Sequence, residues 1–297
     1  PDMALVQGDT TTVLMASLAC FYRQIPVGHV EAGLRTGNMY SPFPEEANRR
    51  LAAPIMSVHF PPTSLSAENL LHEHMAQDTV HVTGNTVIDA LFLELEQQEK
   101  PAIKADIDHQ LSEYLPAGWR DQKYVLVTGH RRENFGGGFE QICEALAHLA
   151  TKFPDHRFIY PVHLNPNVQG PVYDKLRGLD NIHLIPPQGY RSFVSLMADA
   201  RLILTDSGGV QEEAPSLGKP VLVMRDTTER PEGVDAGTVK LVGANSVNII
   251  AEATTLLSDQ QAYNAMAEAK NPYGDGQASQ RIVQVLQQYF DLARSAA

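Results

Sequence analysis

A glycine-containing turn between two apolar segments is the part of this sequence with the clearest capacity for chemistry. Leu202–Thr205 is apolar enough for a buried parallel strand, and Asp206-Ser207-Gly208-Gly209 follows it at once. Residues 210–217 have the composition of a short helix, and residues 221–224 form a second apolar run. Open α/β sheets bind ligands at the carboxyl ends of their strands, which is where this turn is expected to lie.

The residue types of this turn favour a phosphorylated ligand. Gly208 and Gly209 let the backbone approach a ligand closely, and the free N–H groups at the start of a helix favour an anion. Glu213, about one helical turn later, can accept hydrogen bonds from a vicinal diol such as a ribose. An ordinary strand–turn–helix corner would explain Ser-Gly-Gly alone, whereas Glu213 and the later Arg230 together favour a nucleotide site.

Several other polar side chains stand directly after apolar segments that we expect to be strands. They are Asp9, Glu31, His130 with Arg131 and Arg132, His163 and the turn 206–209. A single aspartate in such a place is most often a helix cap, and a single histidine is most often a turn residue. Because the carboxyl ends of parallel strands lie along one edge of a sheet, so many coincidences predict a functional cleft there.

The candidate acid–base groups and the candidate phosphate-binding groups lie in different parts of the chain. The carboxylates Asp9, Glu31 and Glu45 are near its start, whereas His130 and the glycine turn come much later. We therefore expect a cleft between two domains, with a phosphorylated ligand on one wall and acid–base groups on the other.

Strand and helix patterns alternate along the chain and start again near residue 120, which predicts an α/β fold with two doubly wound parallel-sheet domains. We expect residues 1–84 and 278–297 to form the first domain, with the last helix packing back onto it. Residues 85–277, including a helix over residues 87–99, are expected to form the second. Residues 79–82 are predicted as a strand, residues 100–122 as a polar connection and residues 225–237 as a loop.

Composition excludes several classes of protein. The 297 residues contain 23 Lys and Arg against 35 Asp and Glu, a net charge of −12, which argues against a nucleic-acid or anionic-membrane surface. Cys20 and Cys143 lie in apolar helical patterns, as reduced thiols of a cytoplasmic protein do. No apolar run approaches the roughly 20 residues of a membrane-spanning helix. The chain begins at Pro1, already entering a strand, so we expect an N-terminal piece to be missing.

The sequence predicts neither a metal nor a cofactor. The histidines of His72-Glu73-His74 diverge on a helix, so they are poor partners for one metal ion. No glycine fingerprint for NAD follows the first strand, and no Walker lysine pattern for ATP occurs. Gly136-Gly137-Gly138 before a helix is explained equally well as a phosphate cradle or as a flexible loop.

Several longer strings closely resemble the non-hydrolysing UDP-N-acetylglucosamine 2-epimerases. They are GDTTT (8–12), PVGHVEAGLRTG (26–37), SPFPEEANRR (41–50), VTGHRRENFG (127–136), PVHLNPNV (161–168), TDSGGVQEEAPSLGKPVLVMRDTTERPE (205–232) and NPYGDGQAS (271–279). The resemblance runs in order along essentially the whole chain. It implies a GT-B-like fold of two Rossmann-type domains with an interdomain cleft, a homodimer, and no metal or nicotinamide cofactor.

The resemblance also implies an activity, the interconversion of UDP-N-acetylglucosamine (UDP-GlcNAc) and UDP-N-acetylmannosamine (UDP-ManNAc) for bacterial surface polysaccharides. In this family UDP is removed by anti elimination, which leaves a 2-acetamidoglucal, and is then added back. The family's N-terminal Gly-Thr-Arg-Pro-Glu segment and a nearby lysine, which contact the ligand, do not occur in this sequence. We therefore expect the first domain to be incomplete, which puts the activity of the chain as given in question.

Site residues follow from the same resemblance, position by position. The residues matched to acid–base catalysis and to the leaving diphosphate are Asp9, Glu31, Glu45, Arg49 and His130. The residues matched to UDP binding are Gln188, Phe193, Ser207, Gly208, Gly209, Glu213 and Arg230. In this family UDP-GlcNAc can also act as an allosteric activator, for which Arg131 and His163 are the candidate contacts.

Three alternatives stay open. A GT-B glycosyltransferase would share the fold and the nucleotide site, but it has no need for carboxylates around C2 of the sugar. A hydrolysing epimerase would release free ManNAc and UDP. A nucleotide-sugar-binding subunit without catalysis would bind UDP and turn nothing over.

Overall fold

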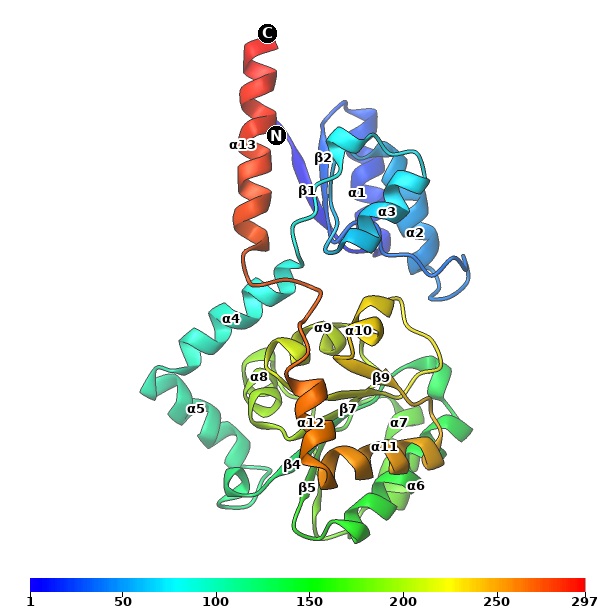
Figure 1. Ribbon diagram of the computed structural model, residues 1–297, viewed down its shortest axis with the longest axis vertical. Coiled ribbons are helices and arrows are strands. Elements are labelled where there is room, and N and C mark those ends of the chain that lie inside the picture. The colour runs from blue at the N-terminus through cyan, green and yellow to red at the C-terminus, as the bar shows by residue number, and fades with distance from the viewer. Residues whose placement is uncertain (297) are drawn as a thin grey trace. The chain divides into compact units, whose positions relative to one another are not determined.

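Residues 1–296 are described by the structure, a computed structural model, and they form two compact units (Figure 1). The first unit contains residues 1–90 and the segment from Pro272 onwards, and the second contains Leu91–Asn271. The strands lie in two parallel sheets, one in each unit, which agrees with the predicted α/β class. None of the helices within residues 1–296 combines the length and the apolarity that a membrane crossing requires.

The second unit is built on a six-stranded parallel sheet with the order β6-β5-β4-β7-β8-β9. Its strands are β4 (Tyr124–Thr128), β5 (Arg157–Pro161), β6 (Ile182–Ile185), β7 (Leu202–Thr205), β8 (Val221–Val223) and β9 (Val239–Leu241). The chain enters the sheet at β4, winds outward through β5 and β6, returns to β7 beside β4 and winds outward again. β4 and β7 are therefore the neighbours between which the winding reverses, the point where such sheets bind ligands.

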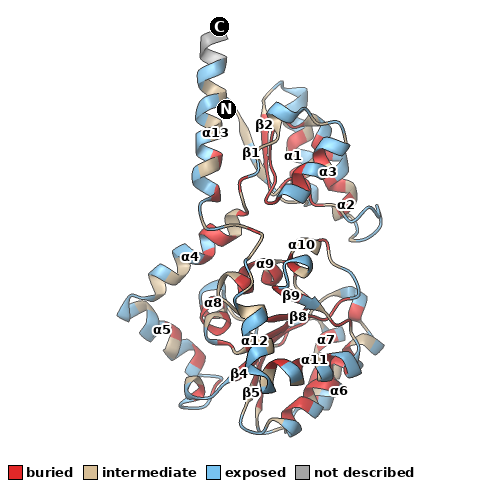
Figure 2. Ribbon diagram, in the orientation of Figure 1, coloured by how far each residue is buried: buried red, intermediate tan, exposed pale blue. Residues whose placement is uncertain are grey.

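Helices cover both faces of this sheet. They are α5 (Pro101–Ser112), α6 (Gly137–Lys152), α7 (Pro166–Leu176), α8 (Tyr190–Asp199), α9 (Gly208–Ser216), α10 (Pro231–Asp235), α11 (Ser246–Ser258) and α12 (Gln260–Ala267), with the short turns η3 (Trp119–Asp121) and η4 (Arg132–Asn134). Val125 and Val127 of β4 pack in one cluster with α6, α7 and α11. Tyr124 and Leu126 point to the other face of the sheet and pack with α5 and α8. Figure 2 shows the inner strands of this sheet buried, whereas β9 is partly exposed. The outer surfaces of the helices are exposed.

The first unit has a three-stranded parallel sheet with the order β1-β2-β3. Its elements are β1 (Ala4–Gln7), α1 (Thr11–Tyr22), β2 (Val27–Val30), α2 (Glu45–Ala52), η1 (Ala53–Ile55), β3 (Val58–Phe60), α3 (Ser64–His72), η2 (Gln77–Thr79) and α13 (Ala278–Ala296). Thr63 caps α3, because its hydroxyl oxygen accepts the Ser66 N–H at 3.1 Å. Ile282 of α13 packs in one cluster with Val30 and Phe60, so the last helix covers this sheet.

The division between the units falls inside α4 (Thr86–Gln98), after Ala90, whereas the sequence placed it before this helix. Asp89, in the first turn of α4, is bonded to the last helix of the first unit. Its carboxylate accepts the N–H groups of Ala278 and Ser279 at 3.1 and 2.7 Å and so caps α13. The start of α4 therefore belongs with the first unit.

The strand predicted over residues 79–82 is absent from the structure. Thr79 ends η2, and Val80 makes a single bridge to His59 before the chain turns away. β-Branched residues in this segment suggested a strand, but only one residue pair is in register with β3.

A helix was missed in the polar stretch after residue 100. Ile103, Ile107 and Leu111 of α5 are spaced four apart and pack against the core of the second unit, while most other positions of the helix are polar. Pro101 stands in its first turn, where a missing N–H costs nothing. The short elements α10 and β9 were missed as well, since each has only a few residues.

Candidate functional site

The second unit contains a cavity of about 280 Å³ at the carboxyl edge of its sheet. Its walls come from the segments after β4, β5, β6 and β7 and from α8 and α9. The lining residues are Thr128, Gly129, His130, Pro161, His163, Pro187, Gln188, Phe193, Ser207, Gly209, Val210 and Glu213. The cavity therefore lies at the reversal point between β4 and β7, and it gathers most of the residues matched to UDP binding.

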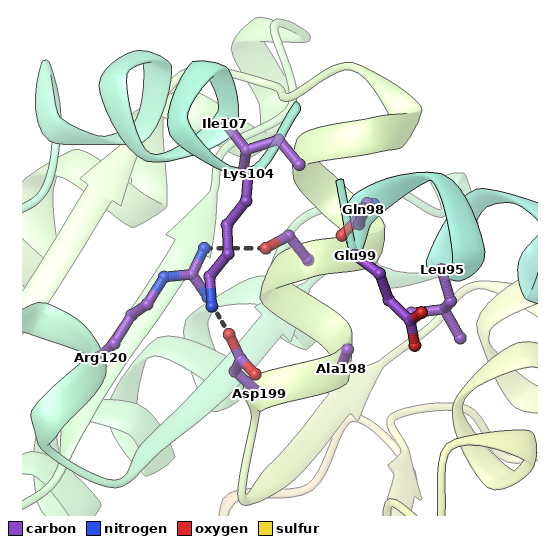
Figure 3. Close-up of a pocket in the computed structure, with 9 residues that line it drawn as sticks. Leu95, Gln98, Glu99, Lys104, Ile107, Arg120, Ala198 and Asp199 are labelled. Carbon is purple, nitrogen blue, oxygen red and sulfur yellow. Dashed lines mark hydrogen bonds and ion pairs between the residues drawn. The ribbon is translucent and has the colours of Figure 1, made fainter. Parts of the chain in front are cut away.

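A larger cavity of about 770 Å³ lies between α4, α5 and α8 of the same unit (Figure 3). The guanidinium of Arg120 in its wall contacts Ser195 at 2.9 Å and the carboxylates of Asp108 and Asp199. Two carboxylates compensate its charge, so it offers an anionic ligand little attraction. None of the residues predicted for chemistry lines this cavity, so the smaller one is the candidate site.

The turn between β7 and α9 supplies backbone N–H groups to the smaller cavity. α9 begins at Gly208, so the N–H groups of Gly208 and Gly209 lie in its first turn, where a helix has no carbonyl groups for them. Gly208 must lack a side chain, because a Cβ atom there would lie 2.5 Å from Nη1 of Arg230 and 2.9 Å from Oε1 of Glu229. With Ser207 as its N-cap residue, the start of α9 is suited to bind a phosphate.

Asp206, the first residue of this turn, is fully buried and holds the loop that follows β4. Its Oδ2 atom accepts the N–H groups of His130 and Arg131, each at 2.9 Å, and the side-chain amide of Asn134 at 3.2 Å. Its Oδ1 atom lies 3.1 Å from His130 N and 3.3 Å from His130 Nδ1. One carboxylate therefore fixes both the backbone and the ring of His130.

The imidazole of His130 borders the cavity in a mixed electrostatic environment. Burial lowers the pKa of His130 below its ordinary value, the Asp206 carboxylate opposes this effect, and the charge of Arg131 strengthens it. The ring stacks on that of His163, with centroids 5.7 Å apart and an angle of 26° between the planes. The His163 ring is oriented by its own loop, because its Nδ1 atom accepts the Asn165 N–H at 3.1 Å.

Glu213 lines the cavity together with a partner that the sequence did not indicate. The Tyr190 hydroxyl donates to Glu213 Oε1 at 2.9 Å. Burial raises the pKa of Glu213 to about 7, while the hydrogen bond from Tyr190 lowers it and the charge of Glu212 raises it further. Glu213 is therefore a buried acceptor whose ionisation changes near neutral pH.

Gln188 and Phe193 lie on the segment from β6 into α8. The Gln188 amide donates to the Pro186 carbonyl oxygen at 2.7 Å, and the Phe193 ring is half-buried against the core of this unit. An amide and an aromatic ring are suited to a planar base, through hydrogen bonding and stacking.

Arg230, which the resemblance matched to nucleotide binding, does not line the cavity. Its buried guanidinium lies against Gly208 and donates to Glu212 and, at 2.7 Å, to Glu229. Glu229 also accepts Nη1 of Arg225 at 2.9 Å. Burial by itself raises the pKa of Glu229, but the charges of Arg230 and Arg225 outweigh it and hold the pKa at about 2. In this structure Arg230 therefore supports the glycine turn rather than facing the cavity.

Arg131 and His163, the candidate allosteric contacts, both lie beside His130. His163 is part of the cavity wall. The Arg131 side chain extends to the buried arginine–glutamate cluster, where its Nη2 atom lies 3.9 Å from Oε1 of Glu229. Only the histidine of this pair therefore lines the candidate site.

In the first unit, Asp9 and Arg49 form an ion pair at the carboxyl end of β1. Arg49 Nε and Nη2 lie 3.0 and 2.9 Å from Asp9 Oδ2, and Arg49 Nη1 lies 3.0 Å from Oε2 of Glu46. Glu46 is fully buried and also accepts the N–H groups of Thr36 and Gly37. Arg49 therefore ties Asp9 to the loop that precedes α2.

Glu31 directly follows β2 and has a left-handed backbone, with φ of +63°. Such a conformation costs a non-glycine residue about 1–3 kcal/mol, and strain of this kind concentrates at functional sites. Its Oε1 atom lies 3.5 Å from the side-chain amide of Asn85, and a Cβ atom on Gly8 would lie 3.3 Å from its Oε2 atom. The Glu31 carboxylate therefore lies beside Gly8, the residue before Asp9, while Glu45 is half-buried at the start of α2.

His29, inside β2, is a candidate that the sequence did not single out. Its Nε2 atom lies 2.8 Å from the Gly8 carbonyl oxygen, and burial lowers its pKa. The neutral ring therefore donates its Nε2 hydrogen to Gly8, the residue before Asp9. The available signal was a polar side chain within the apolar strand that ends just before Glu31.

The two units offer different chemistry. The second has a cavity with an anion-binding turn, an imidazole, a carboxylate and an aromatic ring, which together suit a nucleoside diphosphate. The first has carboxylates suited to proton transfer. Within residues 1–296, no three His, Cys, Asp or Glu side chains gather in a way that would hold a metal ion.

Comparison with known proteins gives one consistent result. The sequence model of the family described as UDP-N-acetylglucosamine 2-epimerase matches residues 1–287. The chain is 59% identical to the UDP-N-acetylglucosamine 2-epimerase of Yersinia pestis over 97% of its own length and 76% of that protein. It is 58% identical to the enzyme of the same name from Escherichia coli K12, over 96% of this chain and 75% of that one.

A solved structure agrees with the sequence comparisons. The crystal structure of UDP-GlcNAc 2-epimerase from Neisseria meningitidis bound to UDP-GlcNAc superimposes with a TM-score of 0.91 at 53% identity. The matched region covers 97% of this chain and 76% of that one.

Proposed function

Because the chain belongs to the UDP-N-acetylglucosamine 2-epimerase family, we propose that it interconverts UDP-GlcNAc and UDP-ManNAc. The observation that carries the proposal is the cavity at the reversal point of the six-stranded sheet, where the start of α9, His130 and Glu213 converge. Each of these groups has a counterpart in UDP. The N–H groups of Gly208 and Gly209 bind phosphate oxygens, Glu213 accepts the ribose hydroxyls, and Phe193 with Gln188 binds the uracil.

The reaction inverts C2 of the sugar, a carbon with no adjacent carbonyl group to make its proton acidic. Elimination avoids this difficulty. A base removes the proton from C2, the C1–O bond breaks, the electron pair forms a C1=C2 double bond, and UDP leaves with its oxygen. Return of UDP to C1 and delivery of a proton to the other face of C2 give the epimer.

We assign the proton transfers at C2 to Asp9, Glu31 and Glu45. Support comes from the strained backbone of Glu31 and from its closeness to the Asp9 loop through Gly8. Arg49 orients Asp9 through its Nε and Nη2 atoms. His29 holds the loop that contains Asp9 by its hydrogen bond to the Gly8 carbonyl oxygen.

His130 stabilises the diphosphate as it departs. Its ring borders the cavity beside the anion-binding turn, and Asp206 holds it in place through both backbone and ring contacts. A hydrogen-bond donor aimed at developing negative charge is worth most where water is excluded.

Four finer features are proposed on the strength of the resemblance. The chain acts as a homodimer, needs no metal or other cofactor, and works in the cytoplasm on sugars for surface polysaccharides. A second UDP-GlcNAc contacts Arg131 and His163 as an activator; the position of His163 in the cavity wall supports this assignment for the histidine.

Proton NMR of UDP-GlcNAc incubated with the chain in D₂O tests the proposal. UDP-ManNAc with deuterium at C2 is the expected product, because proton removal and return exchange this position with solvent. Release of free ManNAc would indicate hydrolysis instead. If UDP binds but the C2 proton is never exchanged, the epimerase assignment falls, and transfer of the sugar to an acceptor becomes the function to test.

A further inference from the structure

We propose that His130 takes up a proton from solvent when the diphosphate of a UDP-sugar binds, and that Asp206 is the positioning residue that makes this uptake necessary. The inference rests on the proposed function, since it requires a diphosphate beside His130. It adds a proton to the binding equilibrium and gives Asp206 a role beyond holding the His130 loop in place.

The contacts of Asp206 decide which nitrogen of His130 carries hydrogen. A carboxylate can only accept hydrogen bonds, and the Oδ2 atom of Asp206 already accepts three N–H groups. The Oδ1 atom lies 3.1 Å from His130 N and 3.3 Å from His130 Nδ1. A hydrogen on Nδ1 is therefore favoured, because a bare nitrogen lone pair would be repelled by this carboxylate oxygen. In a neutral ring, the Nε2 atom is then a bare acceptor.

A bare acceptor is the wrong partner for a phosphate oxygen, which is also an acceptor. With a carboxylate on the Nδ1 side and a diphosphate on the Nε2 side, only the doubly protonated imidazolium satisfies both neighbours. The positive ring also gains charge-assisted bonds to both anions, which favours uptake over displacement of the ligand.

Without ligand, the surroundings of His130 favour the neutral ring. Burial is the largest influence, and the charges of Arg131 on the same loop, His163 after β5 and Arg225 after β8 act in the same direction. Asp206 at the end of β7 is the opposing group, and the pKa of His130 nevertheless lies below its ordinary value. A bound diphosphate adds negative charge to the side of Asp206, so the pKa of His130 rises on binding.

The sign of the pH dependence follows from this rise. Above about pH 7, where Glu213 is ionised, ligand binding weakens as the pH increases, because His130 becomes harder to protonate in the complex. Between the pKa of the free protein and that of the complex, affinity falls about tenfold for each pH unit.

His163 is the other imidazole in the cavity wall, and its contacts give it a different behaviour. Its Nδ1 atom accepts the Asn165 N–H at 3.1 Å, so the neutral ring carries its hydrogen on Nε2. It can donate to a phosphate oxygen without taking up a proton. The two rings stack on one another, but in their neutral forms they carry the hydrogen on different nitrogens. His163 is therefore the control for His130.

Calorimetric titration of the chain with UDP-GlcNAc tests the proposal. The diphosphate of this ligand is a diester without a group that titrates near neutral pH, so any proton exchanged belongs to the protein. The titration is run at about pH 8, where Glu213, with its pKa of about 7, is already ionised, in two buffers of similar composition but different ionisation enthalpy. We expect the observed enthalpies to differ by an amount that corresponds to net proton uptake, and affinity to fall as the pH rises further.

Two variants locate the proton. H130Q should bind UDP-GlcNAc more weakly and with no proton uptake. D206N keeps an oxygen for the three N–H groups but turns an amide donor towards His130 Nδ1, so the ring moves its hydrogen to Nε2. It should bind UDP-GlcNAc within about tenfold of the parent, with uptake lost and the pH dependence flattened. A carboxylate with a purely structural role would change stability and leave proton uptake as it was.

H163Q completes the set and should retain proton uptake. If uptake disappears in H163Q and persists in H130Q, the assignment to His130 is overturned. Binding with the same heat in both buffers would overturn the proton coupling while leaving the proposed function intact. Absence of UDP-GlcNAc binding by the parent chain would remove the proposed function and this inference with it.

Discussion

The two units hold their candidate residues by different means. In the second unit they stand at the ends of strands that are buried on both faces, and every residue of β4 and β7 is buried. In the first unit β2, the strand before Glu31, is also buried along its whole length, whereas Asp9 is held by an ion pair with Arg49. Buried strands therefore position His130, the glycine turn and Glu31, whereas an ion pair orients Asp9.

This difference suits the two tasks. A binding site benefits from rigid walls, since ordering them on binding would cost affinity. Proton transfer requires a carboxylate at a particular atom, which the bond between Arg49 and Asp9 and the strained backbone of Glu31 supply locally. The variants below test whether chemistry and binding separate in this way.

Glu31→Gln should have the largest effect on the reaction. The amide keeps the shape of the side chain but cannot act as a base, so turnover should fall about 10²- to 10⁴-fold. UDP affinity, which depends on the second unit, should stay near that of the parent. Turnover by NMR and UDP affinity by calorimetry check the two parts. A variant that turns over within a few-fold of the parent would remove Glu31 from the mechanism.

Arg49→Met should destabilise the protein most. The change leaves the carboxylate of Glu46 fully buried without its cation, which costs about 3 kcal/mol in the free energy of unfolding. Denaturant unfolding measures this cost. Arg50→Met is the control, because the Arg50 side chain is 45% exposed and its contact with Glu73 is 3.6 Å long. Equal losses in both variants would contradict the role given to Arg49.

Gly208→Ala should damage the second unit, because the added Cβ atom meets Arg230 and Glu229 beneath the turn. We expect a loss of about 1–3 kcal/mol in the free energy of unfolding and weaker UDP binding. Gly209→Ala is the matched control, since its Cβ atom would lie 3.9 Å from its nearest neighbour, Oε2 of Glu213. Thermal unfolding of both variants side by side gives the comparison, and a stable Gly208→Ala protein would show that the turn can shift.

Tyr190→Phe should have the smallest effect. Burial raises the pKa of Glu213 to about 7 even though the hydrogen bond from the Tyr190 hydroxyl lowers it, so removal of this hydroxyl raises that pKa further. Glu213 must be ionised to accept both ribose hydroxyls, and UDP-GlcNAc affinity should therefore fall as the pH drops through about 7 in the parent. In the variant this fall should begin at a higher pH. Identical pH profiles for the two proteins would disconnect Tyr190 from ribose binding.

Much of the site was visible in the sequence because the relevant order is local. Asp9, Glu31, His130 and the turn at Ser207 each follow an apolar strand, and parallel strands bring such positions to one edge of each sheet. Residues 79–82 are too few to distinguish a strand from a single bridge, and α5 was missed because polar residues outnumber its three regularly spaced apolar ones. The division inside α4 depends on Asp89 and its bonds to the last helix, which the pattern of a single helix does not contain.

Residue types and their spacing along the chain determined the α/β class, the anion-binding turn and, through long matching strings, the family. The folded chain decided which side chains face one another. Asp206 meets His130 across 76 residues of sequence, Arg230 lies against Gly208 instead of in the cavity, and Tyr190 reaches Glu213 from another helix. The reason is physical: strand and helix patterns are set by near neighbours, whereas charge and proton placement depend on atoms that only folding brings within hydrogen-bond distance.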